Sequence, residues 1–168
     1  GELVVPGMFT VAGYQNDMLP RIEAQSREYI SGNWVMGAHN KFDSPLALDE
    51  LRQLILNEYK KDYVQQWEAF LAKVQIREAQ QKGELNKLLE TFALINGPLE
   101  ILLGAIEKQT NLAAIDARLV DGDRNSVTNS ELVGVHFAAL NNLAGSEELI
   151  SLVQEMRKLS VLVNEVQA

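Results

Sequence analysis

The residues best suited to chemistry are two histidines. His39 and Asp43 have the four-residue spacing that metal ligands show on a helix, but Gly37 and Pro45 predict a loop around them. We therefore interpret His39 as a solvated loop residue. His136 has no histidine or carboxylate three or four residues away, and we interpret it as a residue at the edge of the core. The histidines predict no metal site.

An acidic loop at residues 121–131 can be compared with a calcium-binding EF-hand loop. Oxygen-bearing side chains occupy four ligand positions of that pattern: Asp121, Asp123, Asn125 and Asn129. Ser126 replaces the required glycine, and Glu131 stands one position before the expected bidentate glutamate. We interpret the segment as a solvated loop between helices.

Paired carboxylates are the other candidates for acid–base chemistry. Two adjacent pairs, at residues 49–50 and 147–148, fit the first turns of predicted helices. Glu58 and Asp62 flank Lys60 and Lys61, which is typical of a charged solvent face. The chain has no cysteine, no phosphate-binding glycine loop and no serine nucleophile elbow. The sequence therefore predicts no enzyme, no cofactor and no metal.

The composition narrows the classes of partner. The 168 residues include 23 Asp plus Glu and 15 Lys plus Arg, a net charge of −8, which argues against nonspecific binding to nucleic acid or anionic membrane. The most apolar stretch, residues 92–106, is shorter than the roughly 20 residues of a spanning helix. The first residue is not Met and the end falls within a helical pattern, so we expect a fragment of a longer protein.

Apolar periodicity predicts an all-α fold, a bundle of about five to six helices around one long helix, with an irregular N-terminal segment that contains one helix. The long helix is expected from about Leu46 to Ile76 or Ala79. Residues 34–37 predict a brief extended segment, and residues 1–44 are expected to pack on a bundle formed by residues 45–168, with a possible boundary near 117–130. The other helices are expected at residues 18–30, 85–95, 98–110, 132–143 and 147–166.

Tyr59, Tyr63 and Trp67 form an aromatic stripe along the long helix. Aromatic side chains at this spacing are typical of a bundle core. They are also enriched at protein–protein interfaces, so a recognition surface is the alternative.

Several short motifs occur in order along the chain. The first are Val5-Pro6-Gly7-Met8-Phe9-Thr10, Gly13-Tyr14 and Trp34-Val35-Met36-Gly37. The segment from Tyr59 to Trp67, which includes Asp62 and Tyr63, follows the pattern Y-x-x-D-Y-x-x-x-W, and Gly97-Pro98-Leu99 comes later. In order and spacing these motifs resemble the IcmF/TssM family of inner-membrane secretion proteins, in which the last motif often reads Ser-Pro-Leu.

The resemblance implies a noncatalytic scaffold in the periplasmic part of a type VI secretion membrane complex. The implied partners are a DotU/TssL-type inner-membrane protein and a TssJ-type lipoprotein, both through other parts of the full-length chain, and further copies of the chain. The alternative function is a helical adaptor or regulator that binds its partner through the aromatic stripe. The family pattern also suggests a second hypothesis for Asp62, a hydrogen bond to the Trp34 segment from a buried position.

Overall fold

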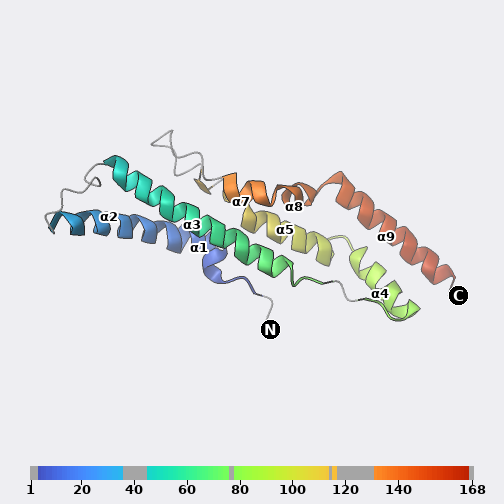
Figure 1. The fold of residues 1–168 in the computed structure, drawn as a ribbon. Helices are drawn as coiled ribbons and strands as arrows, with labels where there is room; N and C mark the ends of the chain where they lie inside the picture. The colour runs from blue at the N-terminus through green and yellow to red at the C-terminus, as the bar shows by residue number, and fades with distance from the viewer. Residues whose placement is uncertain (1–3, 36–44, 76–77, 114, 117–130, 167–168) are drawn as a thin grey trace. The chain divides into compact units, whose positions relative to one another are not determined.

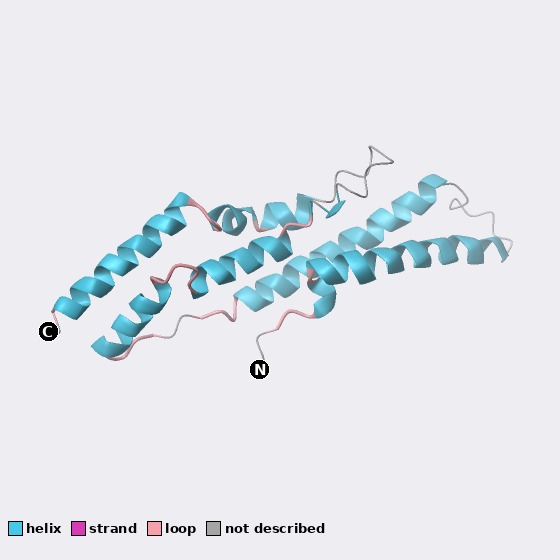
Figure 2. Ribbon diagram, turned by 180° about the vertical axis from the view of Figure 1, so that it is seen from behind, coloured by secondary structure: helices cyan, strands magenta, loops and turns pink. Residues whose placement is uncertain are grey.

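The computed structural model describes residues 4–35, 45–75, 78–113, 115–116 and 131–166. Within these ranges every regular element is helical and none is a strand (Figures 1 and 2). One helix is much longer than the rest, as the periodicity predicts. The predicted all-α class is therefore confirmed.

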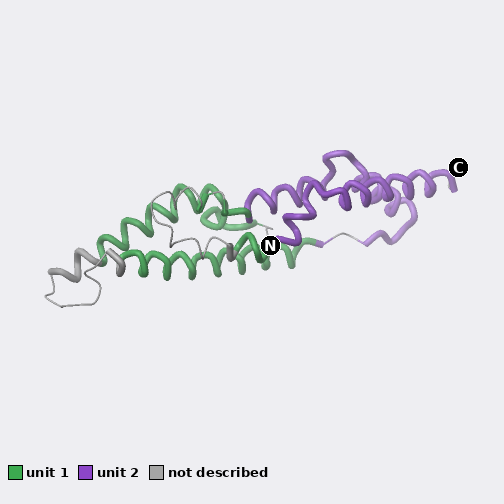
Figure 3. The backbone as a smooth tube through the Cα atoms, turned by 90° about the horizontal axis from the view of Figure 1, so that it is seen from above, with its two compact units in different colours: residues 1–74, 111–136 green, residues 75–110, 137–168 purple. Residues whose placement is uncertain are grey.

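The chain divides into two compact units, coloured separately in Figure 3. The first unit comprises residues 1–74 and 111–136, and the second comprises residues 75–110 and 137–168. This division does not coincide with the predicted one between residues 1–44 and 45–168. The possible boundary near residues 117–130 lies outside the described residues.

The first unit begins with a nearly continuous helical run. A 3-10 turn at Gly7–Phe9 precedes α1 (Val11–Gly13), a π-helical turn at Tyr14–Met18 and α2 (Leu19–Val35). The expected helix end at residues 31–33 is wrong, because α2 continues through Ser, Gly and Asn, which each cost a helix only about 1 kcal/mol or less. The extended segment expected from Trp34 is wrong for Trp34 and Val35, and Met36 and Gly37 are not described.

Pro20 lies well inside this helical run. A proline ring clashes with the carbonyl group four residues earlier in a regular α-helix. Here the wider π-helical turn Tyr14–Met18 directly precedes Leu19 and Pro20. The extra residue in that turn relieves the clash, which is a recognised way for a helix to accommodate an irregularity.

The long helix α3 (Pro45–Leu71) runs beside α2 (Figures 1 and 2). It ends at Leu71, five residues before the expected Ile76, and turns at Lys73 and Val74 close it. Ala72 and Lys73 are exposed, so no apolar contact extends the helix further. The short helix α7 (Glu131–His136) packs against α3 in the same unit.

The second unit contains α4 (Lys82–Phe92), α5 (Pro98–Thr110), α8 (Ala138–Leu143) and α9 (Glu147–Glu165). The α5 bounds are confirmed, whereas α4 ends three residues before the expected Ile95. The single helix expected at residues 132–143 is two helices, because Phe137 leaves helical geometry at φ −97° and ψ 12° between α7 and α8. Asn96 has a positive φ of 56°, and its backbone N–H donates to Glu100 at 2.6 Å, which fixes the turn into α5.

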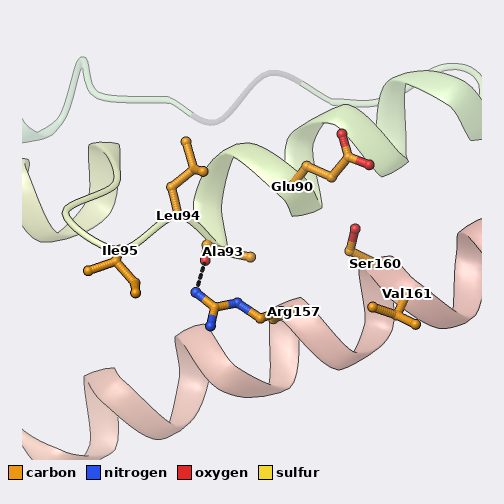
Figure 4. Close-up of a pocket in the computed structure, with 7 residues that line it drawn as sticks. All are labelled: Glu90, Ala93, Leu94, Ile95, Arg157, Ser160 and Val161. Carbon is orange, nitrogen blue, oxygen red and sulfur yellow. Dashed lines mark hydrogen bonds between the residues drawn. The ribbon is translucent and has the colours of Figure 1, made fainter.

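A polar seam joins α4 to α9. Asn86 is buried on α4, and its amide group hydrogen-bonds both Ser160, at 3.2 Å, and Asn164 of α9. Glu90 accepts a hydrogen bond from Asn86 at 3.1 Å and another from Asn164 at 3.2 Å. Arg157 donates to the carbonyl oxygen of Ala93 at 2.8 Å, just beyond the end of α4 (Figure 4). These bonds set the register of the two helices.

The apolar residues of α9 are only partly buried. Leu149 and Val153 are buried, but Leu152, Leu159 and Leu162 are about half exposed. The apolar side chains of α9 span a wider arc of the helix than α4 covers, so one side of the helix keeps exposed leucines.

Ser146 caps α9, and we expect its loss to destabilise the second unit. Its hydroxyl oxygen accepts a hydrogen bond from the backbone N–H of Leu149 at 3.1 Å. Ser146→Ala should lower the free energy of unfolding by about 1 kcal/mol, measured by urea denaturation followed by circular dichroism. Ser151→Ala, an exposed change within the same helix, should stay within about 0.5 kcal/mol of the parent. Equal losses in the two variants would contradict the capping role.

Candidate functional site

The N-terminal motif at residues 5–10 forms a tight turn closed by Thr10. The backbone N–H of Phe9 donates to the carbonyl oxygen of Pro6 at 2.8 Å. The Thr10 hydroxyl donates to the carbonyl oxygen of Gly7 at 2.7 Å and accepts from the backbone N–H of Gly13 at 3.1 Å. Thr10 is therefore both the end of the 3-10 turn and the N-cap of α1.

Gly13 is required by the close approach of two backbone segments. A Cβ atom at this position would lie 2.1 Å from the carbonyl oxygen of Gly7 and 2.8 Å from the Cα atom of Met8. No larger residue fits without moving the turn away from α1. The pairing of the Gly7 and Gly13 motifs in the sequence thus has a steric cause.

The turn places Phe9 and Tyr14 in contact with the aromatic stripe of α3. Tyr59 lies between them, stacked on Phe9 with ring centroids 5.7 Å apart and on Tyr14 at 5.5 Å. Tyr63 meets Phe9 and Tyr59 edge-on, at 6.1 and 5.9 Å. All four rings are buried, so the stripe is core and offers no recognition surface in this fold.

The same stripe hydrogen-bonds the backbone of the turn. The Tyr59 hydroxyl donates to the carbonyl oxygen of Met8, and Trp67 Nε1 donates to that of Phe9 at 2.9 Å. Two successive backbone carbonyl groups are thereby satisfied by side chains two turns apart on α3. These bonds hold the turn in one orientation, which stacking alone would not do.

A buried ion pair completes the cluster. Lys60 Nζ lies 2.9 Å from Asp116 Oδ2, and the Tyr14 hydroxyl donates to Asp116 Oδ1 at 2.5 Å. Both oxygens of the carboxylate are therefore used. Lys60 Nζ also lies 5.9 Å from the centroid of the Tyr14 ring. Lys60 and Asp116 are 2% and 5% exposed, and Asp116 stands in the turn that follows Leu112. We call these residues, with Phe9, Tyr59, Tyr63 and Trp67, the aromatic–ionic lock.

Burial changes the titration of the three tyrosines of the lock. Desolvation raises the pKa of Tyr14 far above its usual value, and the charge of Asp116 raises it further. Desolvation also raises the pKa of Tyr59, with a smaller contribution from Tyr63, and it is the largest cause of the raised pKa of Tyr63. The three phenols stay protonated at neutral pH, and those of Tyr14 and Tyr59 act as hydrogen-bond donors rather than bases.

The structure brings together most of the residues that carry the family resemblance, but not all. The lock and its turn contain Pro6, Gly7, Phe9, Thr10, Gly13, Tyr14, Tyr59, Tyr63 and Trp67. Gly97 and Pro98 belong to the second unit. The side chain of Trp34 and all of Gly37 lie outside what the structure describes. Asp62 is exposed, as expected of a solvent face, so the hypothesis that it is a buried carboxylate is wrong.

The sequence argument missed the two charged members of the lock. It assigned Lys60 to the solvent face of α3 and gave Asp116 no role, yet both are buried. A signal for Lys60 was present. At 100° per residue, its position on α3 falls among those of Tyr63, Val64 and Trp67, all three of which are buried. Asp116 had no such signal, because its partners are distant in the sequence.

Elsewhere in the described residues the chemistry is sparse. His136 Nε2 lies 2.8 Å from Glu68 Oε1 at the surface of the first unit, and both side chains are about half exposed. No group of three or more His, Asp or Glu side chains in the described part could hold a metal ion. In the same part, no helix is long and apolar enough to cross a membrane. The calcium-loop candidate and His39 fall on residues that are not described.

The second unit has an open groove of about 480 Å³ between the end of α4 and α9 (Figure 4). Its lining is mostly apolar and comprises Glu90, Ala93, Leu94, Ile95, Arg157, Ser160 and Val161. The polar groups of Glu90, Arg157 and Ser160 already bond the chain itself. The groove therefore presents no convergent set of free polar groups for catalysis.

Comparison with known proteins gives one family match. A family model described as "IcmF-related: Intracellular multiplication and human macrophage-killing" matches residues 1–111. This range contains the N-terminal turn and the aromatic stripe, and it ends shortly before Asp116. No curated protein and no solved structure gave a significant match.

The steric role of Gly13 can be tested directly. Gly13→Ala should lower the free energy of unfolding of the first unit by about 2–3 kcal/mol, because the added Cβ displaces the turn from its contacts. Gly134→Ala is the matched control, a helical glycine of the same unit with open space around it. It should leave stability unchanged or raise it by up to about 1 kcal/mol. Chemical denaturation measures both, and a tolerated Gly13→Ala would refute the close approach.

The buried ion pair should be far more sensitive than its exposed neighbour. Lys60→Met leaves the Asp116 carboxylate buried without a cation, and should cost about 3–5 kcal/mol in unfolding free energy. Lys61→Met removes only an exposed pair with Glu58 and should cost less than about 0.5 kcal/mol.

The double variant Lys60→Met/Asp116→Asn tests whether the charge is the cause. It removes the unpaired charge and keeps an acceptor for Tyr14, so it should be more stable than Lys60→Met alone. Additive losses in the double variant would mean that Lys60 contributes by packing instead of charge.

Proposed function

This chain belongs to the IcmF-related family, and we propose that it is a noncatalytic scaffold module of a secretion-system membrane complex. The family connects the chain with a secretion complex of several subunits and with a membrane-associated protein. The more specific parts of the proposal are a periplasmic location, within a longer inner-membrane protein of the TssM type, and a contribution to assembly of a trans-envelope complex.

The observation that carries the scaffold proposal is the aromatic–ionic lock. Its polar atoms bond one another or the backbone: both oxygens of Asp116, the Tyr14 and Tyr59 hydroxyls, and the Trp67 indole. A catalytic cluster needs polar groups turned toward a substrate, and this cluster is buried and internally satisfied. Its effect is to hold the N-terminal motif and the turn after Leu112 against one long helix. A rigid arrangement of this kind suits a structural element of an assembly.

Two further features support this role. Every residue of the lock except Asp116 lies within the family-matched range. The aromatic stripe, through which an adaptor could have bound a partner, is buried in the first unit. The adaptor alternative therefore loses the surface on which it was based. Contacts with a DotU/TssL-type protein and a TssJ-type lipoprotein are proposed for other parts of the longer protein.

The proposal can be tested in a bacterium whose own copy of the full-length protein is replaced by variants. Gly13→Ala should reduce recovery of the membrane complex by affinity purification, and secretion should fall in the same proportion, because a scaffold acts only through assembly. His136→Ala and Glu68→Gln, which remove the exposed acid–base candidate, should leave both measurements unchanged.

Protein amount must be matched by immunoblot before the variants are compared. Loss of secretion in His136→Ala with a fully assembled complex would indicate chemistry at that pair, and would overturn the noncatalytic proposal. Full secretion by a Gly13→Ala variant whose complex is not recovered would overturn the assembly role.

A further inference from the structure

The helix α9 has a buried side and an exposed apolar stripe. Leu149, Val153 and Ser160 are buried, and Ser160 hydrogen-bonds Asn86 of α4. The exposed stripe consists of Leu152, Leu159 and Leu162, with Val166 directly after the last residue of α9, and their exposed fractions are 45%, 50%, 56% and 84%. Large apolar side chains are thus exposed along most of the second half of α9 and at its end.

The spacing of the exposed stripe is that of a coiled-coil seam. Leu152, Leu159 and Val166 recur every seven residues, and Leu162 falls three residues after Leu159. At 3.6 residues per turn these positions lie on one face. Glu155 takes the remaining seam position, near one end, where it pairs with Lys158 at 2.7 Å and stays in water. The central pair, Leu159 and Leu162, is the most continuous part of the seam.

The charged residues beside this seam can form ion pairs with the same residues of a second copy. Lys158 and Glu165 lie along its outer edge, seven residues apart and of opposite sign, and both are exposed. If a second α9 runs antiparallel, with Leu159 opposite Leu162 of the other copy, coiled-coil geometry places Lys158 beside Glu165 of that copy. Two-fold symmetry forms the pair twice. A parallel pairing would instead set Lys158 beside Val163, with no charge partner.

We propose that this seam of α9 pairs with the same seam of a second copy of the chain, antiparallel, with Leu159 and Leu162 at the centre and two Lys158–Glu165 ion pairs at the edge. The proposal deepens the scaffold function, on which its biological meaning rests, by naming the partner and the surface. One short seam buries less than a standard protein–protein interface, so the free dimer is weak, with a dissociation constant on the order of 100 µM. In an assembly that holds several copies close together, such a contact is largely occupied.

The first experiment is sedimentation equilibrium of the 168-residue chain from about 10 µM to 1 mM, a range that brackets the expected dissociation constant. The parent should change from monomer to dimer across it. Leu159→Lys and Leu162→Lys, which place a charge at the centre of the seam, should each abolish dimerisation. The matched control is Ile150→Lys, an equally exposed apolar position of α9 outside the seam, which should dimerise like the parent. Circular dichroism melting must show that all variants remain folded.

The second experiment tests the antiparallel register by charge exchange. Lys158→Glu and Glu165→Lys each bring like charges together twice per dimer, and each should weaken dimerisation by about tenfold at low salt. The double variant Lys158→Glu/Glu165→Lys restores opposite charges and should recover the parental constant. None of these exposed substitutions touches the bonds between α4 and α9, so folding is preserved in the set.

Three outcomes overturn the proposal: a parent that remains monomeric at about 1 mM, a dimer that Leu159→Lys leaves intact, or a double exchange that fails to restore binding. These outcomes are separable from failure of the scaffold function. A monomeric chain whose full-length parent still assembles the membrane complex would refute the α9 pairing alone. If the chain dimerises as expected but secretion does not depend on recovery of the membrane complex, the scaffold function alone is refuted.

Discussion

The Asp116 carboxylate is the group on which the first unit depends, because it is charged, buried and shared. Removing a carboxylate and an ammonium group from water costs several kcal/mol for each ion, and their attraction offsets this cost only when the geometry is good and the remaining lone pairs are satisfied. Here Lys60 takes one oxygen and the Tyr14 hydroxyl takes the other. A buried pair of this kind contributes more to choosing one arrangement than to stability, since any rearrangement leaves a charge without a partner.

This constraint explains why the motifs at residues 5–14 and 59–67 occur together. Tyr14 reaches Asp116 only if α1 is in place, and α1 is in place only if Gly13 lets its backbone approach Gly7. Tyr59 stacks on the ring of Tyr14, and its hydroxyl hydrogen-bonds the backbone of the turn. The same helix therefore contacts both a side chain and the backbone of the N-terminal segment. The motifs are separate in the sequence, and each is required by the geometry of the others.

The sequence predicted the helices whose positions depend on local patterns, and it missed the contacts between residues that are distant in the chain. Apolar periodicity and N-terminal signals located α5 and the start of α9, because Pro98 and Ser146 act within their own turns. The predicted end of α2 was wrong because Ser31, Gly32 and Asn33 are only weak helix breakers. The aromatic stripe was recognisable from its spacing. The ion pair of Lys60 with Asp116 was not recognisable, because no local pattern around Asp116 indicates a contact with a lysine 56 residues earlier in the chain.

The two units use buried polarity in different ways, and this bears on the exposed face of α9. In the first unit the ion pair of Lys60 and Asp116 is buried together with the aromatic stripe of α3. In the second, Asn86, Ser160 and Asn164 occupy the contact between two helices, where large apolar side chains would otherwise pack. Amide groups at such positions specify register at a cost in apolar burial. The leucines that this contact does not use remain on the outer side of α9. A helix with a polar contact on one side and exposed leucines on another has the arrangement expected where a second subunit covers the leucines.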